Sequence, residues 1–277
     1  MAADTESRLV QDLVGKFKQL LERCPIPPWA FPYKPAVPFV GKDYESGPRI
    51  LVYGSAENLR PGSQEASFYN DPEKAFLRRW HWRQYYSQRP AKQPNLFFGP
   101  GIGIEPFDSG GLLVAVYYAA WRLGMATRNT PQDFVETLAV SNWCKFSINS
   151  ESGKNRDYAN NPAKLKPSFA YVVEEIKLLK PSVVILPKKT YQCQKKAMDE
   201  ACREKPRFFV PVPQFAYWVI NHHLKPFAPR ASKMRAEMDR TEPTIAKWMG
   251  EITVRGAKKG NHWRFLAAVA DVLDQQP

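Results

Sequence analysis

Residues 167–186 read PSFAYVVEEIKLLKPSVVIL, a stretch that joins a helix pattern to a strand pattern. Residues 167–180 follow helical spacing, with Pro167 at the expected helix start. Residues 182–186 (SVVIL) are a short apolar run rich in β-branched residues, which is typical of a strand buried on both faces. This helix–strand unit predicts an α/β fold with a parallel sheet.

The same alternation extends along the chain in both directions. Strand patterns occur at 49–53 (RILVY, ended by Gly54), 134–140 and 207–212, and helix patterns at 110–124 and 263–273. We therefore predict a three-layer α/β/α fold around a central, mainly parallel four-stranded sheet. In such sheets the ligand lies beyond the carboxyl ends of the strands. The loops leaving those ends begin at Gly54, Ser141 and Pro213.

The chain divides into an N-terminal extension and one larger domain. Residues 1–46 comprise an amphipathic helix and a proline-rich connector, which we expect to pack on the core. Residues 47–277 are expected to form a single α/β domain. Residues 60–103 form an insertion that interleaves aromatic and basic side chains, and it should overhang the ligand site.

Charge indicates the class of partner. The 277 residues carry 40 Lys and Arg against 27 Asp and Glu, a net charge of +13, which favours an anionic partner and nucleic acid first.

No apolar run suits a membrane span, and MAADTESRLVQDL has no signal core. The four cysteines form no C-x-x-C. We expect a cytoplasmic monomer, nucleoid-associated if bacterial, without a metal or organic cofactor.

Several common enzyme motifs are absent from the sequence. It contains no G-x-G-x-x-G, P-loop, H-E-x-x-H or G-x-S-x-G. Clustered carboxylates of the metal-site type do not occur near the three loops, which argues against a nuclease.

Four ordered segments carry a family resemblance. Gly54-Ser55-Ala56-Glu57-Asn58 follows a strand, and PFDSGGLL (106–113) opens a helix. Ser141-Asn142-Trp143-Cys144-Lys145 follows another strand, and KLLKPSVVIL (177–186) closes the series. Over residues 47–275 this order resembles the uracil-DNA glycosylase superfamily, above all its family 4 and family 5 branches.

The sequence departs from that family at informative positions. Gln214 stands where the family has a catalytic histidine, and Ser55 where the first motif has its acid. The iron–sulfur cysteines of family 4 are missing, since Phe146 follows Lys145. The stretch between the first two motifs is also longer.

The resemblance implies a monofunctional DNA glycosylase that flips out a base and leaves an abasic site. The departures favour a non-uracil pyrimidine, such as hydroxymethylated or glucosylated cytosine of phage DNA, and hence antiviral defence. The alternatives are a catalytically inactive DNA-binding module on the same fold, a uracil-DNA glycosylase in base-excision repair, and a single-stranded DNA or RNA binder that works through the aromatic insertion.

Three residues are candidates for catalysis. Glu57 would hold the attacking water and offset positive charge on the sugar, or it caps a helix or forms a surface ion pair. Gln214 would donate to a base carbonyl in place of the histidine, or it is an ordinary strand-end residue. Asp108 is the competing carboxylate, although capping of the helix at 110–124 is the favoured role for it.

Base binding is assigned to Gly54, Ser55, Phe107 and Asn142. The Asn142 amide offers a donor and an acceptor to a pyrimidine edge, or it caps the strand end. Phe107 would stack on the base, or it belongs to the core.

DNA binding is assigned to His222, His223, Leu224, Lys225 and Arg230, at the start of a basic stretch that runs to Arg264. Leu224 would be a wedge that fills the gap left by the flipped base, or the segment is a solvated loop. Lys145 is expected to contact phosphate or pack its stem rather than form a Schiff base.

Overall fold

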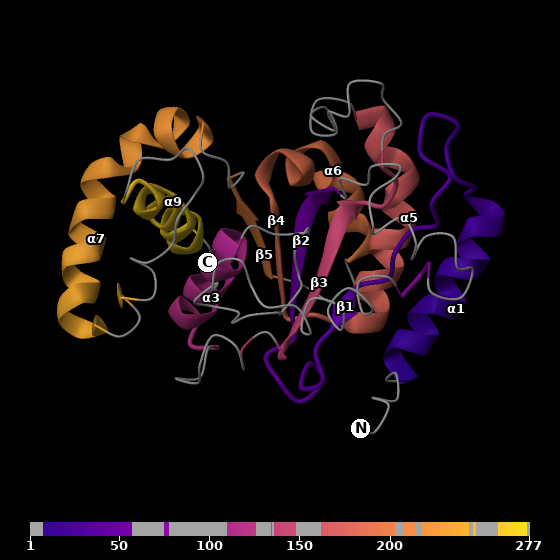
Figure 1. Ribbon diagram of the computed structural model, residues 1–277, viewed down its shortest axis with the longest axis horizontal. Coiled ribbons are helices and arrows are strands. Elements are labelled where there is room, and N and C mark those ends of the chain that lie inside the picture. The colour runs from indigo at the N-terminus through magenta and orange to yellow at the C-terminus, as the bar shows by residue number, and fades with distance from the viewer. Residues whose placement is uncertain are drawn as a thin grey trace, which may run out of the picture.

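Four parallel strands form the centre of the fold, and a fifth strand joins one edge. The computed structural model describes residues 8–56, 75–77, 110–125, 134, 136–147, 162–202, 208–213, 218–243, 246–247 and 260–275. The strands are β1 (Phe39–Val40), β2 (Ile50–Ala56), β3 (Leu138–Cys144), β4 (Val183–Pro187) and β5 (Phe208–Val212). They lie in the order β1-β3-β2-β4-β5 (Figure 1).

The α/β class is confirmed, but the predicted four-stranded sheet needs one correction. β2, β3, β4 and β5 pair in parallel, whereas β1 pairs with β3 in antiparallel fashion, so the sheet has five strands and is mixed. The sequence did not indicate β1 because a two-residue strand has no periodicity to detect. It lies at the end of the proline-rich connector.

The boundaries of two predicted strands are wrong. β2 does not end at Gly54 but continues to Ala56, because Gly54 and Ala56 pair with Asn142 and Cys144 of β3. β3 begins at Leu138 rather than at residue 134, and it ends at Cys144 rather than at residue 140, so Ser141 and Asn142 lie in the strand and not in a loop. The backbone N–H and the hydroxyl of Thr137 both donate to the Phe134 carbonyl three residues earlier, a contact typical of a turn rather than of a strand.

Helices cover both faces of the sheet (Figure 1). One face carries α3 (Gly110–Arg122), α7 (Ala228–Thr241) and α9 (His262–Asp274). The other carries α1 (Arg8–Arg23), α5 (Pro162–Leu179) and α6 (Lys188–Ala201). A π-helical turn, η3 (Val219–His223), and a 3-10 turn, η4 (Lys225–Phe227), lie between β5 and α7. Within the described ranges, none of the helices is long and apolar enough to cross a membrane.

The helix at 167–180 begins earlier than predicted, and two helices were not predicted. Pro162 is the first residue of α5, so Pro167 lies inside the helix. α6 buries only Thr190 and Met198, and most of its other residues are charged or carry amides, so its apolar pattern is too sparse to indicate a helix. The same reasoning applies to α7, which lies in the stretch that we interpreted only as basic.

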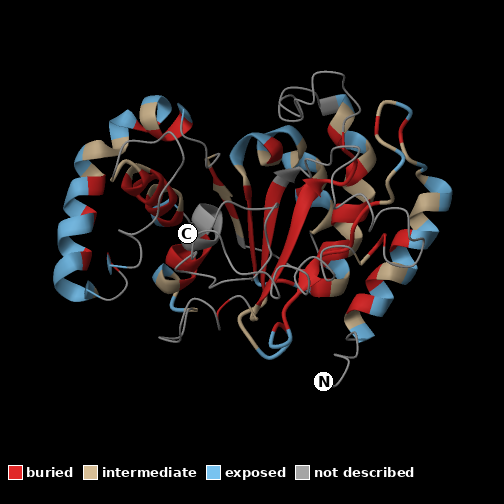
Figure 2. Ribbon diagram, in the orientation of Figure 1, coloured by how far each residue is buried: buried red, intermediate tan, exposed pale blue. Residues whose placement is uncertain are grey.

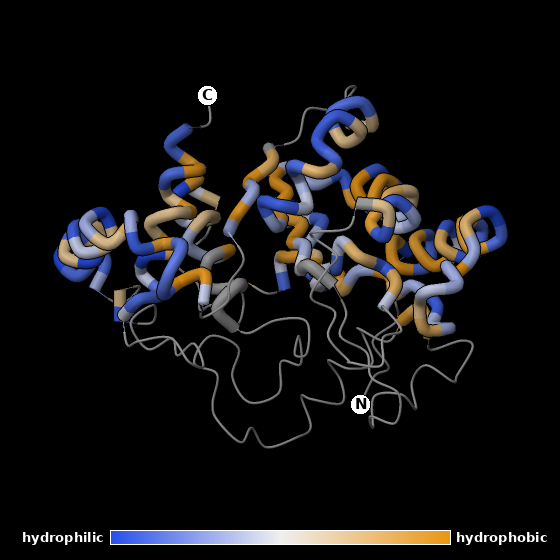
Figure 3. The backbone as a smooth tube through the Cα atoms, turned by 90° about the horizontal axis from the view of Figure 1, so that it is seen from above, coloured by the Kyte–Doolittle hydropathy of each residue, from blue (hydrophilic) through white to orange (hydrophobic). Residues whose placement is uncertain are grey.

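Each strand contributes alternate side chains to two separate cores. Ile50 and Val52 of β2 belong to the cluster under α3 and α9. Leu51 and Tyr53 belong to the cluster under α5 and α1. The described side chains of β1 and β3 are accordingly buried, as are most of those of β2 and β4, whereas α1 and α7 have exposed outer faces (Figure 2). The view from above shows the same division, with apolar segments gathered on the sheet and hydrophilic ones on the outer helices (Figure 3).

The N-terminal extension contacts the core directly. Phe17 of α1 packs edge-on against Tyr171 of α5, with 5.0 Å between the ring centroids. The connector is also held, since the Val37 N–H donates to the carbonyl of Phe76 over 2.9 Å. Phe76 is buried, so this part of the insertion belongs to the core. The rest of 60–103 lies outside the described residues.

Candidate functional site

At the carboxyl end of β2, the connections that follow neighbouring strands lead to opposite faces of the sheet. Among the described elements, the next helix after β2 is α3, on one face of the sheet, whereas the next helices after its neighbours β3 and β4 are α5 and α6, on the other face. Open α/β sheets bind ligands where neighbouring connections diverge in this way. Gly54 of β2 and Asn142 of β3 are paired at this point.

Asn142 is a buried residue whose side-chain amide has no hydrogen-bond partner among the described residues. Its exposed fraction is 0%, and neither Nδ2 nor Oδ1 has a hydrogen-bond partner in the structure as described. By strand alternation, Asn142 projects to the same face as Leu138 and Val140, the side covered by α3. Its paired residue, Gly54, has no side chain to contact it. A buried polar group without a partner is unfavourable, which is why such a group indicates a role beyond folding.

The opposite face of β3 carries a satisfied polar cluster, which we call the Glu175 network: Tyr53, Ser141, Lys145 and Glu175. The Tyr53 hydroxyl donates to Glu175 Oε2 over 2.8 Å. Ser141 Oγ lies 3.0 Å from Glu175 Oε1 and accepts from Lys145 Nζ over 2.7 Å. Lys145 and Glu175 form an ion pair in which both side chains are completely buried. This network fixes the end of β3 to α5.

The Glu175 network also determines the properties of its members. Burial and the adjacent Glu175 carboxylate raise the pKa of Tyr53, so its phenol stays protonated. The Lys145 ammonium lies 5.4 Å from the Tyr53 ring centroid and is enclosed by the core. A buried, paired ammonium does not reach DNA phosphate, so that part of the expectation for Lys145 is wrong. Its contribution is structural.

The predicted catalytic residues lie outside the described ranges. These are Glu57, Asp108 and Gln214, and the stacking candidate Phe107 lies outside them as well. Their roles remain predictions. Gly54 and Ser55 are described as part of β2 rather than of a loop, which places their backbone beside Asn142 and Trp143.

The segment predicted to bind DNA forms the short turns η3 and η4 and the start of α7, and one of its residues is oriented differently from the prediction. His222, His223 and Lys225 are exposed on η3 and η4. Leu224, by contrast, is 5% exposed and packs in the cluster under α9. An intercalating side chain must be exposed, so the predicted Leu224 wedge is wrong. The π-helical turn carries Leu224 inward, because its N–H donates to the Val219 carbonyl five residues earlier.

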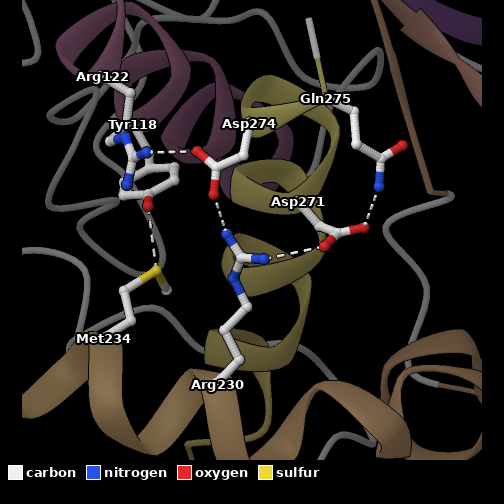
Figure 4. Close-up of polar contacts among 7 residues, drawn as sticks. All are labelled: Tyr118, Arg122, Arg230, Met234, Asp271, Asp274 and Gln275. Atoms are coloured by element: carbon white, nitrogen blue, oxygen red, sulfur yellow. Dashed lines mark hydrogen bonds and ion pairs between the residues drawn. The ribbon is translucent and has the colours of Figure 1, made fainter.

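Arg230 is engaged by carboxylates of the protein. Its guanidinium donates to Asp271 over 2.9 Å and also pairs with Asp274, which accepts from Arg122 as well (Figure 4). These contacts join α7, α9 and α3. They account for Arg230 within the fold, and its contact with DNA remains a prediction.

Trp218 is a candidate residue that the sequence analysis missed. In the described part of the chain, Trp218 is the large hydrophobic residue that is exposed to solvent, with an exposed fraction of 42%. The Trp218 ring meets His223 edge-on, with 5.1 Å between centroids. The run FAYWVI gave no signal, because an apolar run does not reveal which member faces solvent.

Comparisons with known proteins add no relative. No family model, no curated protein and no solved structure matched the chain. Over the described residues, no three His, Cys, Asp or Glu side chains lie together in a way that could hold a metal ion.

Proposed function

We propose that the protein is a monofunctional DNA glycosylase that flips a modified pyrimidine out of DNA and hydrolyses its N-glycosidic bond. The observation that carries the proposal is the Asn142 amide, buried without a partner beside Gly54 at the divergence of the connections. A ligand with a donor and an acceptor on one edge would satisfy both of its atoms. A pyrimidine base has such an edge.

The chemistry of the reaction is compatible with this location. Cleavage of the bond leaves an anionic base and a sugar with positive character. Asn142 Nδ2 would donate to the base as its negative charge develops. α3 begins at the same edge of the sheet (Figure 1), and a helix N-terminus favours negative charge. Glu57, which follows β2 directly, would place the water on the sugar side.

The proposed substrate is a base larger than uracil, such as hydroxymethylated or glucosylated cytosine of phage DNA. This part rests on the sequence, namely Gln214 in place of the family's histidine and the long insertion at 60–103. Replacing 60–103 with a short loop should shift preference toward small bases. Phe76 should be kept in that variant, because it packs in the core.

A base-release assay tests the proposal. Unmodified, uracil-containing, hydroxymethylated and glucosylated genomic DNAs are incubated with the protein, abasic sites are cut with alkali, and released bases are identified by mass spectrometry. We expect release of one modified base, lost in Glu57→Gln with DNA affinity retained. Release of uracil alone would make the protein a repair enzyme. DNA binding without any release would favour the inactive DNA-binding module.

A further inference from the structure

We propose that Trp218 is a stacking platform for an unpaired base of DNA, presented on the turn formed by η3 and η4. This inference rests on DNA as the partner in the proposed function, but not on catalysis. The first observation is the exposure of Trp218 at 42%, which is unusual for the largest apolar side chain on a basic segment. An indole face is a sequence-tolerant surface for a base.

The turn beneath Trp218 is held in place. Val219, Ile220 and Leu224 are buried in the cluster under α9, so the residues that follow Trp218 are fixed to the core. Asn261 Nδ2 donates to Asn221 Oδ1 over 2.9 Å, which attaches η3 to the start of α9. His223 packs perpendicular to the indole and limits its rotation. A platform that is ordered before binding loses little entropy when a base stacks on it.

The charge of the segment that carries Trp218 suits a polyanion. From Lys205 to Ala236 the sequence contains no Asp or Glu and includes six Lys and Arg residues, of which Arg230 and Arg235 form ion pairs with Asp271, Asp274 and Asp239. Exposed Lys225 lies on η4, immediately after the π turn. An aromatic surface beside cationic side chains is the combination that binds single strands, through stacking and phosphate contacts.

An unpaired base is the occupant that fits this surface. Bases inside a duplex have both faces covered by their neighbours, so an indole on the protein surface reaches a base face only where the strand is unpaired. Trp218 follows the carboxyl end of β5 by six residues, and Asn142 lies at the carboxyl end of β3 in the same sheet. β2 and β4 lie between β3 and β5 in the sheet, so Trp218 would take an unpaired base other than the one that Asn142 reads.

Binding of unmodified single-stranded DNA tests the platform independently of catalysis. Fluorescence anisotropy with a labelled oligothymidine gives the affinity over a range of salt concentrations. We expect Trp218→Ala to weaken binding about tenfold with an unchanged salt slope, because it removes stacking but no charge. Trp218→Phe should bind within about threefold of the parent chain. Lys225→Ala should instead reduce the salt slope by about 0.7, the value for one phosphate contact on a single strand.

Three outcomes would overturn the platform. Unchanged affinity in Trp218→Ala would show that no base stacks there. A fall in both affinity and salt slope in Trp218→Ala would show that the substitution also removes phosphate contacts, and so does not act through stacking alone. Tighter, Trp218-dependent binding of an RNA of the same sequence would exclude DNA as the partner. Failure of base release with a positive result here would reject the glycosylase alone, since this assay involves no cleavage.

Discussion

Ser141 and Asn142 are neighbours on β3, yet their side chains have different surroundings on opposite faces of the sheet. Ser141 belongs to the Glu175 network, in which hydroxyl, ammonium and carboxylate groups satisfy one another. Asn142 is equally buried, but both of its polar atoms lack partners among the described residues. The comparison indicates that one polar group at this strand end serves the fold, whereas the other is available to a ligand.

The largest effect is expected from breaking the buried ion pair. Glu175→Gln leaves the Lys145 ammonium buried without its counter-charge, which should cost about 3–5 kcal/mol in the free energy of unfolding. Urea denaturation measures this. The double variant Lys145→Met/Glu175→Gln is neutral and should recover most of the loss. A double variant as unstable as the single one would show that charge is not what holds the network together.

Ser141 and Asn142 themselves form a matched pair for mutation. Ser141→Ala removes hydrogen bonds from Lys145 and Glu175 and should destabilise the protein by about 1–3 kcal/mol. Asn142→Leu removes a buried amide without partners and should leave stability unchanged or raise it by about 1 kcal/mol. Thermal and urea unfolding compare the two variants. Strong destabilisation by Asn142→Leu would assign Asn142 to the fold as well.

The pH dependence of stability tests the role of Tyr53 in the Glu175 network. Burial and Glu175 raise the pKa of Tyr53 above its usual 10.0, so the unfolded chain loses this proton first as the pH rises. The stabilisation of the folded protein by the protonated Tyr53 is therefore complete below pH 10. Above pH 10 it is lost, by at most about 1.4 kcal/mol per pH unit. Unfolding curves from pH 8 to 11 should show a shallower alkaline loss in Tyr53→Phe. Identical slopes would contradict this assignment.

The smallest effect is expected from an ion pair to which water has access. Arg230 pairs with Asp271 and Asp274 at partly exposed positions, so Arg230→Gln should cost less than about 1 kcal/mol in the free energy of unfolding. Added salt should weaken these pairs but leave the Glu175 network unaffected. A cost as large as that of Glu175→Gln would show that burial is not the decisive difference between them.

The sequence predicts the elements that bury a clear apolar pattern. β2, β4, β5 and α9 were found because their apolar residues recur at the spacing of their own structure. β1 is too short to show a period, and α6 and α7 bury too few apolar side chains to show one. Pro167 was misinterpreted because a proline tolerated inside α5 looks the same in sequence as one that begins a helix.

The candidate site was predicted in part. Asn142 was singled out by its position after a strand, but its lack of a partner depends on packing that no local pattern encodes. The burial of Leu224 and the exposure of Trp218 were missed for a similar reason. A π turn shifts the inward-facing positions away from ordinary helical spacing, so Leu224 turns into the core while Trp218 remains exposed.

The proposed glycosylase function requires Asn142 to read the base, and single-turnover base release tests this requirement most directly. Asn142→Ala and Ser141→Ala are compared with the parent chain on the DNA that gives release, at a temperature where all three are folded. We predict that Asn142→Ala slows release about 100- to 1,000-fold without loss of stability. Ser141→Ala should lose stability but release the base at nearly the parent rate. Release by Asn142→Ala at the parent rate would show that Asn142 does not read the base.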